Sequence, residues 1–103
     1  MSYSVHVGPQ EQLPPSFEGD VTYNVSAMLK RAGIHPNVLH NLPVVHVRPV
    51  IWNAYMVMRE NPEYFRQFDA PNGWGTYETT FAFVERLTAY LDGAPHDYVM
   101  RWN

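Results

Sequence analysis

The chain has 103 residues, 46% apolar and 15% aromatic, which predicts one domain, residues 1–103, with its own hydrophobic core. Its formal net charge is −3, and its seven Lys and Arg residues form no basic stripe, which argues against binding of duplex nucleic acid. The absence of Cys excludes a disulfide scaffold, a thiol nucleophile and thiolate metal sites.

The same sequence predicts a cytoplasmic protein with no membrane partner. Residues 1–8 lack the positive start and the apolar stretch of a signal peptide. No window approaches the roughly 18 consecutive apolar residues that span a bilayer. A chain without Cys is also compatible with a reducing compartment.

The first third of the chain predicts one strand, a loop and a short strand. In residues 2–7, apolar side chains alternate with small or polar ones, as in a half-buried strand. Residues 8–19 contain three prolines and predict an irregular surface loop. Residues 20–23 fit a second, short strand.

A short helix is predicted next, over residues 25–32. Asn24 is a favourable N-cap for it, and Gly33 followed by Ile34 fits the Schellman motif that ends many helices. Residues 34–48 are broken by prolines, and the valines of residues 44–47 suggest a brief extended piece.

Three helices and a strand are predicted for the rest of the chain. Pro49 suits the first turn of one helix, and Asn61-Pro62-Glu63 begins a shorter helix that reaches about Phe68. Thr76 can cap the longest helix, which Gly93 ends. That helix carries an apolar stripe formed by Tyr77, Phe81, Val84, Leu87 and Leu91.

Residues 98–102 alternate like a strand and can pair with the first strand. The expected fold class is therefore α+β. A small antiparallel sheet of two or three strands, including both termini, would pack against three or four helices.

The segment 71–78, Pro-Asn-Gly-Trp-Gly-Thr-Tyr-Glu, is the strongest candidate for a site. Pro-Asn-Gly favours a tight turn, and Gly75 permits a positive φ or a close approach of the backbone. One interpretation is structural: a turn, a helix cap and an aromatic plug. The other is functional: Trp74 and Tyr77 would stack on a planar ligand, while amides at the helix start would hold an anionic group.

The segment 22–28 has the same two interpretations. Asn24 and Ser26 can cap a helix or donate hydrogen bonds to a ligand. If the two helix starts converge in space, Asn24, Asn72, Trp74 and Tyr77 would form a small polar and aromatic pocket.

Catalytic and metal-binding patterns are weak, and we expect no cofactor. The five His residues show neither the i,i+4 pair nor the His-x-His spacing of metal ligands. The acidic pairs, Glu60 with Glu63 and Glu78 with Glu85, are most simply solvated helix faces. No catalytic residue is predicted, although a site assembled from distant residues would leave no such pattern.

Aromatic and Met side chains are plentiful between residues 52 and 68. Core packing explains most of them, but part of the set can form an exposed patch for a partner or for a homodimer. The set consists of Trp52, Tyr55, Met56, Met58, Tyr64, Phe65 and Phe68.

The two segments together resemble a group of small acidic proteins from bacteria and their phages. The shared patterns are T-x-N-V-x-x-M, present at residues 22–28, and N-G-W-G-[ST]-Y-[ED], present at residues 72–78. The resemblance covers about two thirds of the chain and implies no activity. It makes the matching residues the first choice for a shared binding site or structural clasp: Asn24, Asn72, Gly73, Trp74, Gly75 and Tyr77.

These observations support three functional hypotheses. The first is a non-enzymatic accessory protein, phage- or bacteria-borne, that binds a host protein through an aromatic-rich surface. The second is a protein that binds or sequesters a nucleotide-like ligand at the loop of residues 72–77. An enzyme is the third. A closed pocket at Trp74, an apolar patch at Trp52 and Phe65, or a His beside a carboxylate in a cleft would distinguish them.

Overall fold

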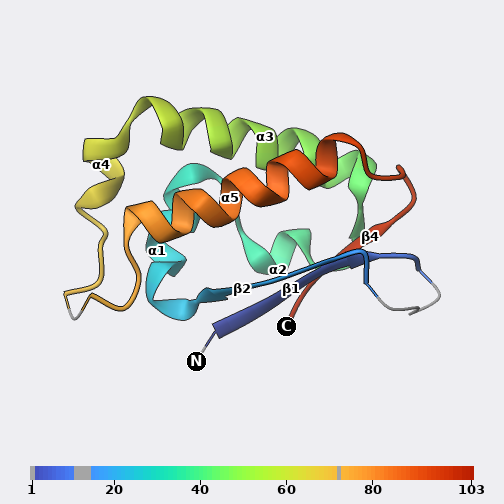
Figure 1. The fold of residues 1–103 in the computed structure, drawn as a ribbon, viewed down its shortest axis with the longest axis horizontal. Helices are drawn as coiled ribbons and strands as arrows, with labels where there is room; N and C mark the ends of the chain where they lie inside the picture. The colour runs from blue at the N-terminus through green and yellow to red at the C-terminus, as the bar shows by residue number, and fades with distance from the viewer. Residues whose placement is uncertain (1, 11–14, 72) are drawn as a thin grey trace.

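The computed structural model describes residues 2–10, 15–71 and 73–103, and it has an α+β fold (Figure 1). The strands are β1 (Ser2–Gly8), β2 (Phe17–Thr22), β3 (Leu42–Pro43) and β4 (Val99–Trp102). A 3₁₀ turn, η1 (Tyr23–Val25), precedes the helices α1 (Ser26–Ala32), α2 (Pro36–Leu39), α3 (Val44–Glu60), α4 (Pro62–Arg66) and α5 (Tyr77–Asp92).

In the described part of the chain, an antiparallel four-stranded sheet has the order β2-β1-β4-β3. The predicted pairing of the first and last strands is confirmed, with Val5 opposite Trp102 and Val7 opposite Met100. The sheet has one strand more than expected, because the two-residue β3 adds to the edge of β4. Such a short strand leaves no alternation for a sequence pattern to reveal.

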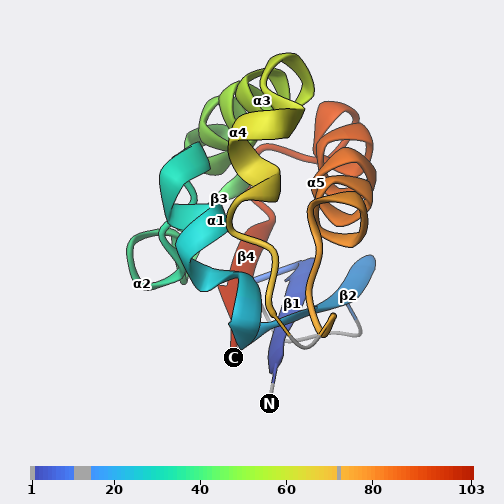
Figure 2. The same cartoon turned by 90° about the vertical axis from the view of Figure 1, so that its left-hand side faces the viewer.

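Helices α3 and α5 lie side by side over one face of the sheet (Figures 1 and 2). They are antiparallel, since Arg48 near the start of α3 contacts the end of α5, and Met58 near the end of α3 contacts its start. The core between helices and sheet contains fully buried Val5, Val7, Ile51, Val84 and Leu87, among others. Layering of helices on a sheet gives each element a face to bury.

The predicted start of the second long helix at Pro49 is wrong, and so is the extended piece over residues 44–47. Helix α3 begins at Val44, and Pro49 lies inside it. The N–H groups of Val44 and Val45 donate to the carbonyl oxygens of Tyr98 and His96, at 2.7 and 3.2 Å. Acceptors from a distant segment therefore satisfy the start of this helix, which no local pattern announces.

The first half of the chain needs two further corrections. Strand β2 begins at Phe17, inside the predicted loop, because residues 17–19 extend the ladder as far as Val7. Asn24 does not cap the helix that follows: Thr22 accepts a hydrogen bond from the N–H of Asn24, and α1 itself has no side-chain cap.

Several helix boundaries are confirmed. Gly33 has φ +100° and forms the predicted Schellman motif with Ile34, whose N–H donates to Leu29 at 2.8 Å. Helix α5 begins after Thr76, as predicted, in a capping box. Its buried stripe includes Thr80 and Phe83 in addition to predicted members, while Phe81 is only partly buried.

Candidate functional site

The two sequence motifs meet at one end of the molecule, where the loop before α5 runs past η1 (Figure 2). The Asn24 side-chain amide donates a hydrogen bond of 2.9 Å to the backbone carbonyl of Trp74. A methyl group built on Gly75 would lie 2.8 Å from Val25 and 3.0 Å from Thr22. The convergence of the two helix starts, predicted as a condition for a shared site, is therefore present between these segments.

Gly75 is required here for two independent reasons. Its φ is +131°, a conformation that side chains strongly disfavour, and its α-carbon lies directly against the η1 segment. Gly73 also has a positive φ, of +76°, but nothing lies within 4 Å of the position where its side chain would be. Glycine is thus required at position 75 by packing and by backbone geometry, and at position 73 by backbone geometry alone.

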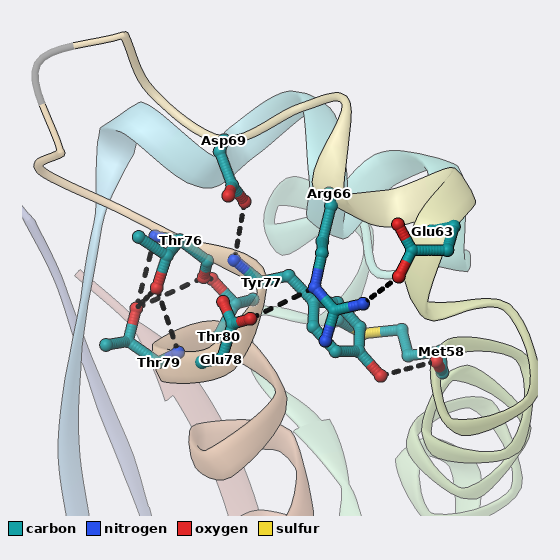
Figure 3. A network of polar contacts seen from close by, with 9 residues as sticks. All are labelled: Met58, Glu63, Arg66, Asp69, Thr76, Tyr77, Glu78, Thr79 and Thr80. Carbon is teal, nitrogen blue, oxygen red and sulfur yellow. Dashed lines mark hydrogen bonds and ion pairs between the residues drawn. The ribbon is translucent and has the colours of Figure 1, made fainter.

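Backbone hydrogen bonds close the loop on itself. The N–H of Ala70 donates to the carbonyl of Gly75 at 2.9 Å, and the N–H of Gly73 donates to the carbonyl of Ala70 at 3.0 Å. At the junction with α5, the carboxylate of Asp69 accepts from the N–H of Tyr77 at 2.7 Å (Figure 3). We call residues 69–71 and 73–76 the clasp; Asn72, one of the predicted site residues, lies outside the described residues.

Thr76 and Thr79 complete the junction. Each hydroxyl accepts a hydrogen bond of 3.2 Å from the backbone N–H of the other residue, as Figure 3 shows. This is a capping box in which Thr takes the place of the usual Glu or Gln. The clasp is therefore followed directly by the first turn of α5, which both threonines cap.

Tyr77 is a core residue, which corrects the prediction that it stacks on a ligand beside Trp74. Its side chain is 6% exposed, and its hydroxyl donates a hydrogen bond of 2.7 Å to the carbonyl of Met58. Its ring stacks on Phe81 with 5.5 Å between centroids. Burial raises the pKa of the Tyr77 hydroxyl, although the positive charge of Arg66 opposes that shift.

Arg66 covers Tyr77 from the solvent side. Its guanidinium lies 5.1 Å from the centre of the Tyr77 ring, donates to Glu78 at 3.0 Å and forms an ion pair with Glu63 (Figure 3). The hydrogen bond from Arg66 lowers the pKa of Glu78, and the same bond raises the pKa of Arg66. This network joins α4 to α5 across the base of the clasp.

Trp74 is the most exposed large apolar side chain on the described surface, at 73%. Beside the clasp, Asn24, Phe68, Asp69, Ala70 and Pro71 line an open groove of about 370 Å³. Tyr23, next to Asn24 in the chain, is 39% exposed. Exposed aromatic surface and a groove thus gather at the end of the molecule where the two motifs meet.

The predicted aromatic patch of residues 52–68 is only partly exposed. Phe65 and Met58 are fully buried, so they belong to the core. Trp52 and Tyr64 are 54% and 44% exposed. Trp52 and Tyr55 line a separate groove of about 240 Å³ between α3 and α5, away from the clasp.

We searched the described residues for metal-binding groups and for His residues paired with carboxylates. No group of three or more His, Asp or Glu side chains among them is placed to hold a metal ion. His6 shares a groove of about 260 Å³ with Glu18 and Asp20, but none of the ion pairs found in the described ranges joins it to either carboxylate. His40 accepts a hydrogen bond at its Nδ1 atom from the N–H of Trp102, at 3.0 Å.

Among the helices of the described ranges, none combines the length and apolar character needed to cross a bilayer. Comparison of the chain with models of protein families, with curated proteins and with solved structures finds no match.

Sequence reasoning missed one residue that builds this end of the molecule, Asp69, and assigned another, Phe68, to the predicted aromatic patch. Asp69 holds the first N–H of α5 from eight positions upstream, a spacing outside the local capping patterns. Phe68 lines the groove and lies 5.7 Å from the guanidinium of Arg31 on α1. The aromatic residues before the clasp indicated Phe68, whereas no local sequence pattern indicated Asp69.

Proposed function

We propose that this chain is a non-enzymatic interaction protein that binds a protein partner through the surface around Trp74. The exposure of the Trp74 side chain, 73% on a loop held by hydrogen bonds and close packing, carries the proposal. Tryptophan is among the residues most enriched at the energetic centres of protein interfaces. A large apolar side chain kept in water costs solubility, and a binding partner explains it.

The contacts of the clasp support this role. Binding usually costs free energy because loops and side chains become ordered at the interface. Here the backbone that follows the indole is already held, by Asn24 at the Trp74 carbonyl and by Gly75 against η1. A partner would therefore meet a preorganised anchor, with the groove of about 370 Å³ beside it to receive an apolar side chain.

The nature of the partner follows from the resemblance stated above. Small bacterial and phage proteins with these two motifs would act on components of the host cell, so we propose a host protein, in the cytoplasm, as the partner. The host partner is proposed from the resemblance and not from the geometry of the site.

The alternative of a nucleotide-like ligand at the same loop loses one of its two stacking rings, because Tyr77 is buried under Arg66. A planar ligand would have to stack on Trp74 alone, in an open groove. Sites for such ligands usually enclose most of the ligand surface.

The proposal is tested by affinity capture from bacterial lysate with the wild-type protein, Trp74→Ala and Val38→Ala. Both variants shorten an exposed apolar side chain, at residues that are 73% and 67% exposed, so both should remain folded. A protein retained by the wild type and by Val38→Ala, and lost with Trp74→Ala, supports the proposal once the purified pair reproduces it. Equal retention by all three proteins would refute a role for Trp74. Native mass spectrometry, by detecting a small bound mass, would favour the ligand alternative.

A further inference from the structure

We infer a second binding site, independent of the clasp, in the groove between α3 and α5. We propose that it binds a segment of a partner protein that carries two basic side chains about 10 Å apart. The groove has a volume of about 240 Å³ and is lined by Trp52, Tyr55, Glu85, Thr88, Ala89 and Asp92. We call it the α3–α5 groove.

The aromatic wall comes from α3. Trp52 and Tyr55 are three positions apart and so share one face of the helix. The Tyr55 ring is held in place by stacking on Phe81, with 5.5 Å between centroids and 12° between planes. Trp52 lines the groove and is 54% exposed, so part of its indole is accessible there. Aromatic faces attract cations and cover the aliphatic stems of Lys and Arg.

The opposite wall is acidic. Glu85, Thr88, Ala89 and Asp92 recur at the spacing of one helix face on α5, and the small Ala89 leaves room between the two carboxylates. Glu85 and Asp92 are exposed and take part in none of the ion pairs or side-chain hydrogen bonds found in the described residues.

Within the described ranges, the nearby arginines form no ion pair with either carboxylate. Arg48 donates to the carbonyl oxygens of Leu91 and Ala94, at 2.8 Å each. Arg86 lies over the ring of Phe17 at 5.4 Å, on the sheet side of α5. An apolar groove with two unpaired carboxylates is complementary to a basic, partly aliphatic occupant.

The spacing of the carboxylates selects a chain segment over a small cation. Seven residues on a helix correspond to about 10.5 Å along its axis. Two basic residues at positions i and i+3 of a polyproline II segment, which has three residues per turn, lie on the same side and are separated by about 9 Å. One small cation can neutralise only one of the two carboxylates, whereas such a segment reaches both and lays its intervening residues along Ala89.

The test is a titration of the ¹⁵N-labelled protein, followed by two-dimensional NMR, with two synthetic peptides. The first has Arg at positions i and i+3 in a Ser/Thr background, and the second has Gln in place of each Arg. We expect saturable shifts at the Trp52 indole N–H and at the amides of residues 85–92 with the Arg peptide only. Argininamide, a single small cation, should bind more weakly than the Arg peptide.

Variants of the groove separate specific binding from general attraction to an acidic protein. Glu85→Gln/Asp92→Asn should weaken the Arg peptide by about fivefold, as expected for partly exposed ion pairs. Trp52→Ala should weaken it by about two- to fivefold, the range of an exposed cation–π contact. The matched control, Glu18→Gln/Glu60→Gln, removes the same charge elsewhere and should change nothing.

The proposal is overturned by any of three results: no shifts in the groove, equal binding of the Gln peptide or argininamide, or equal weakening by the control pair. Trp74→Ala, which tests the clasp, leaves every wall of this groove intact. Failure of one proposal is therefore distinguishable from failure of the other.

Discussion

The two ends of the α3–α5 pair are held by different kinds of contact. Where α5 begins, Thr76 and Thr79 cap the helix within one turn, and Asp69 adds a bond from eight residues away. Where α5 ends and α3 begins, Arg48 reaches carbonyl groups 43 and 46 positions away in sequence. The first turn of α5 is therefore capped from within its own segment, whereas the end of α5 is tied to α3 by a side chain from a distant segment.

This difference also bears on function. The proposed partner surface lies at the end where α5 is capped locally and where two short motifs, joined by a hydrogen bond between residues 50 positions apart, meet. The opposite end stabilises the fold. There the first N–H groups of α3 donate to carbonyl groups of residues 96–98, and no side chain of the described residues caps the helix. Substitutions at the two ends should therefore differ in what they destroy, binding at one and stability at the other, with Gly75 as the exception.

Gly75→Ala should give the largest loss of stability, about 2–5 kcal/mol in the free energy of unfolding, because it combines backbone strain with overpacking against Val25. Urea denaturation measures it. Gly73→Ala is the matched control: it has the positive φ without the clash, so about 1 kcal/mol is expected. Equal losses in the two variants would show that the contact with η1 does not fix the clasp.

Arg48→Met should cost about 2–4 kcal/mol at the opposite end. It keeps most of the aliphatic stem but removes two charged donors, which leaves the carbonyl groups of Leu91 and Ala94 without these partners. Arg59→Met, at an exposed position of the same helix, should stay within about 0.5 kcal/mol. Thermal unfolding of both variants compares them, and similar melting temperatures would contradict a structural role for Arg48.

Tyr77→Phe should cost about 1–2 kcal/mol, because the buried carbonyl of Met58 loses its 2.7 Å hydrogen bond from Tyr77 and keeps the longer one, of 3.4 Å, from the N–H of Asn61. Its effect also depends on pH. Burial raises the pKa of Tyr77, so the folded state favours the neutral phenol. That contribution is complete below the unfolded pKa, about 10, and is lost as pH rises through the folded pKa.

The wild-type protein should therefore lose stability above about pH 10 more steeply than Tyr77→Phe does. Tyr90→Phe, at a partly buried tyrosine with no hydroxyl partner among the described residues, should keep the alkaline dependence of the wild type. Parallel curves for the wild type and Tyr77→Phe would mean that the Tyr77 hydroxyl is not buried.

The same contrast explains how much of the fold the sequence predicts. Helix α5 and the end of α1 are predicted correctly because Thr76 and Gly33 act within a few residues of themselves. The start of α3 and the strand β3 depend on residues 96–100, so a proline pattern read locally places the helix five residues too late. Tertiary acceptors replace the caps that sequence patterns detect.

The candidate site shows the same limit. The glycines around Trp74 mark a constrained loop, whereas the sequence offers the approach of this loop to Asn24 only as a condition for a shared site. Sequence patterns place Tyr77 both in the apolar stripe of the last helix and in the ligand site, and only the stripe agrees with its burial. Spacing along a helix settles such a conflict better than residue type does, because it reports which way the side chain faces.

Asn24→Ala is the mildest of these changes and the most informative about the clasp. It removes one exposed hydrogen bond to the Trp74 carbonyl, so the cost should be about 0.5–1 kcal/mol. Its main effect should be on order: hydrogen exchange at the amides of residues 73–75 should accelerate more than at α5. If binding of the partner then weakens by more than the lost stability explains, preorganisation of Trp74 contributes to affinity. Unchanged exchange would mean that the hydrogen bond from Asn24 does not order the loop, and Asn24 would no longer be assigned to the proposed site.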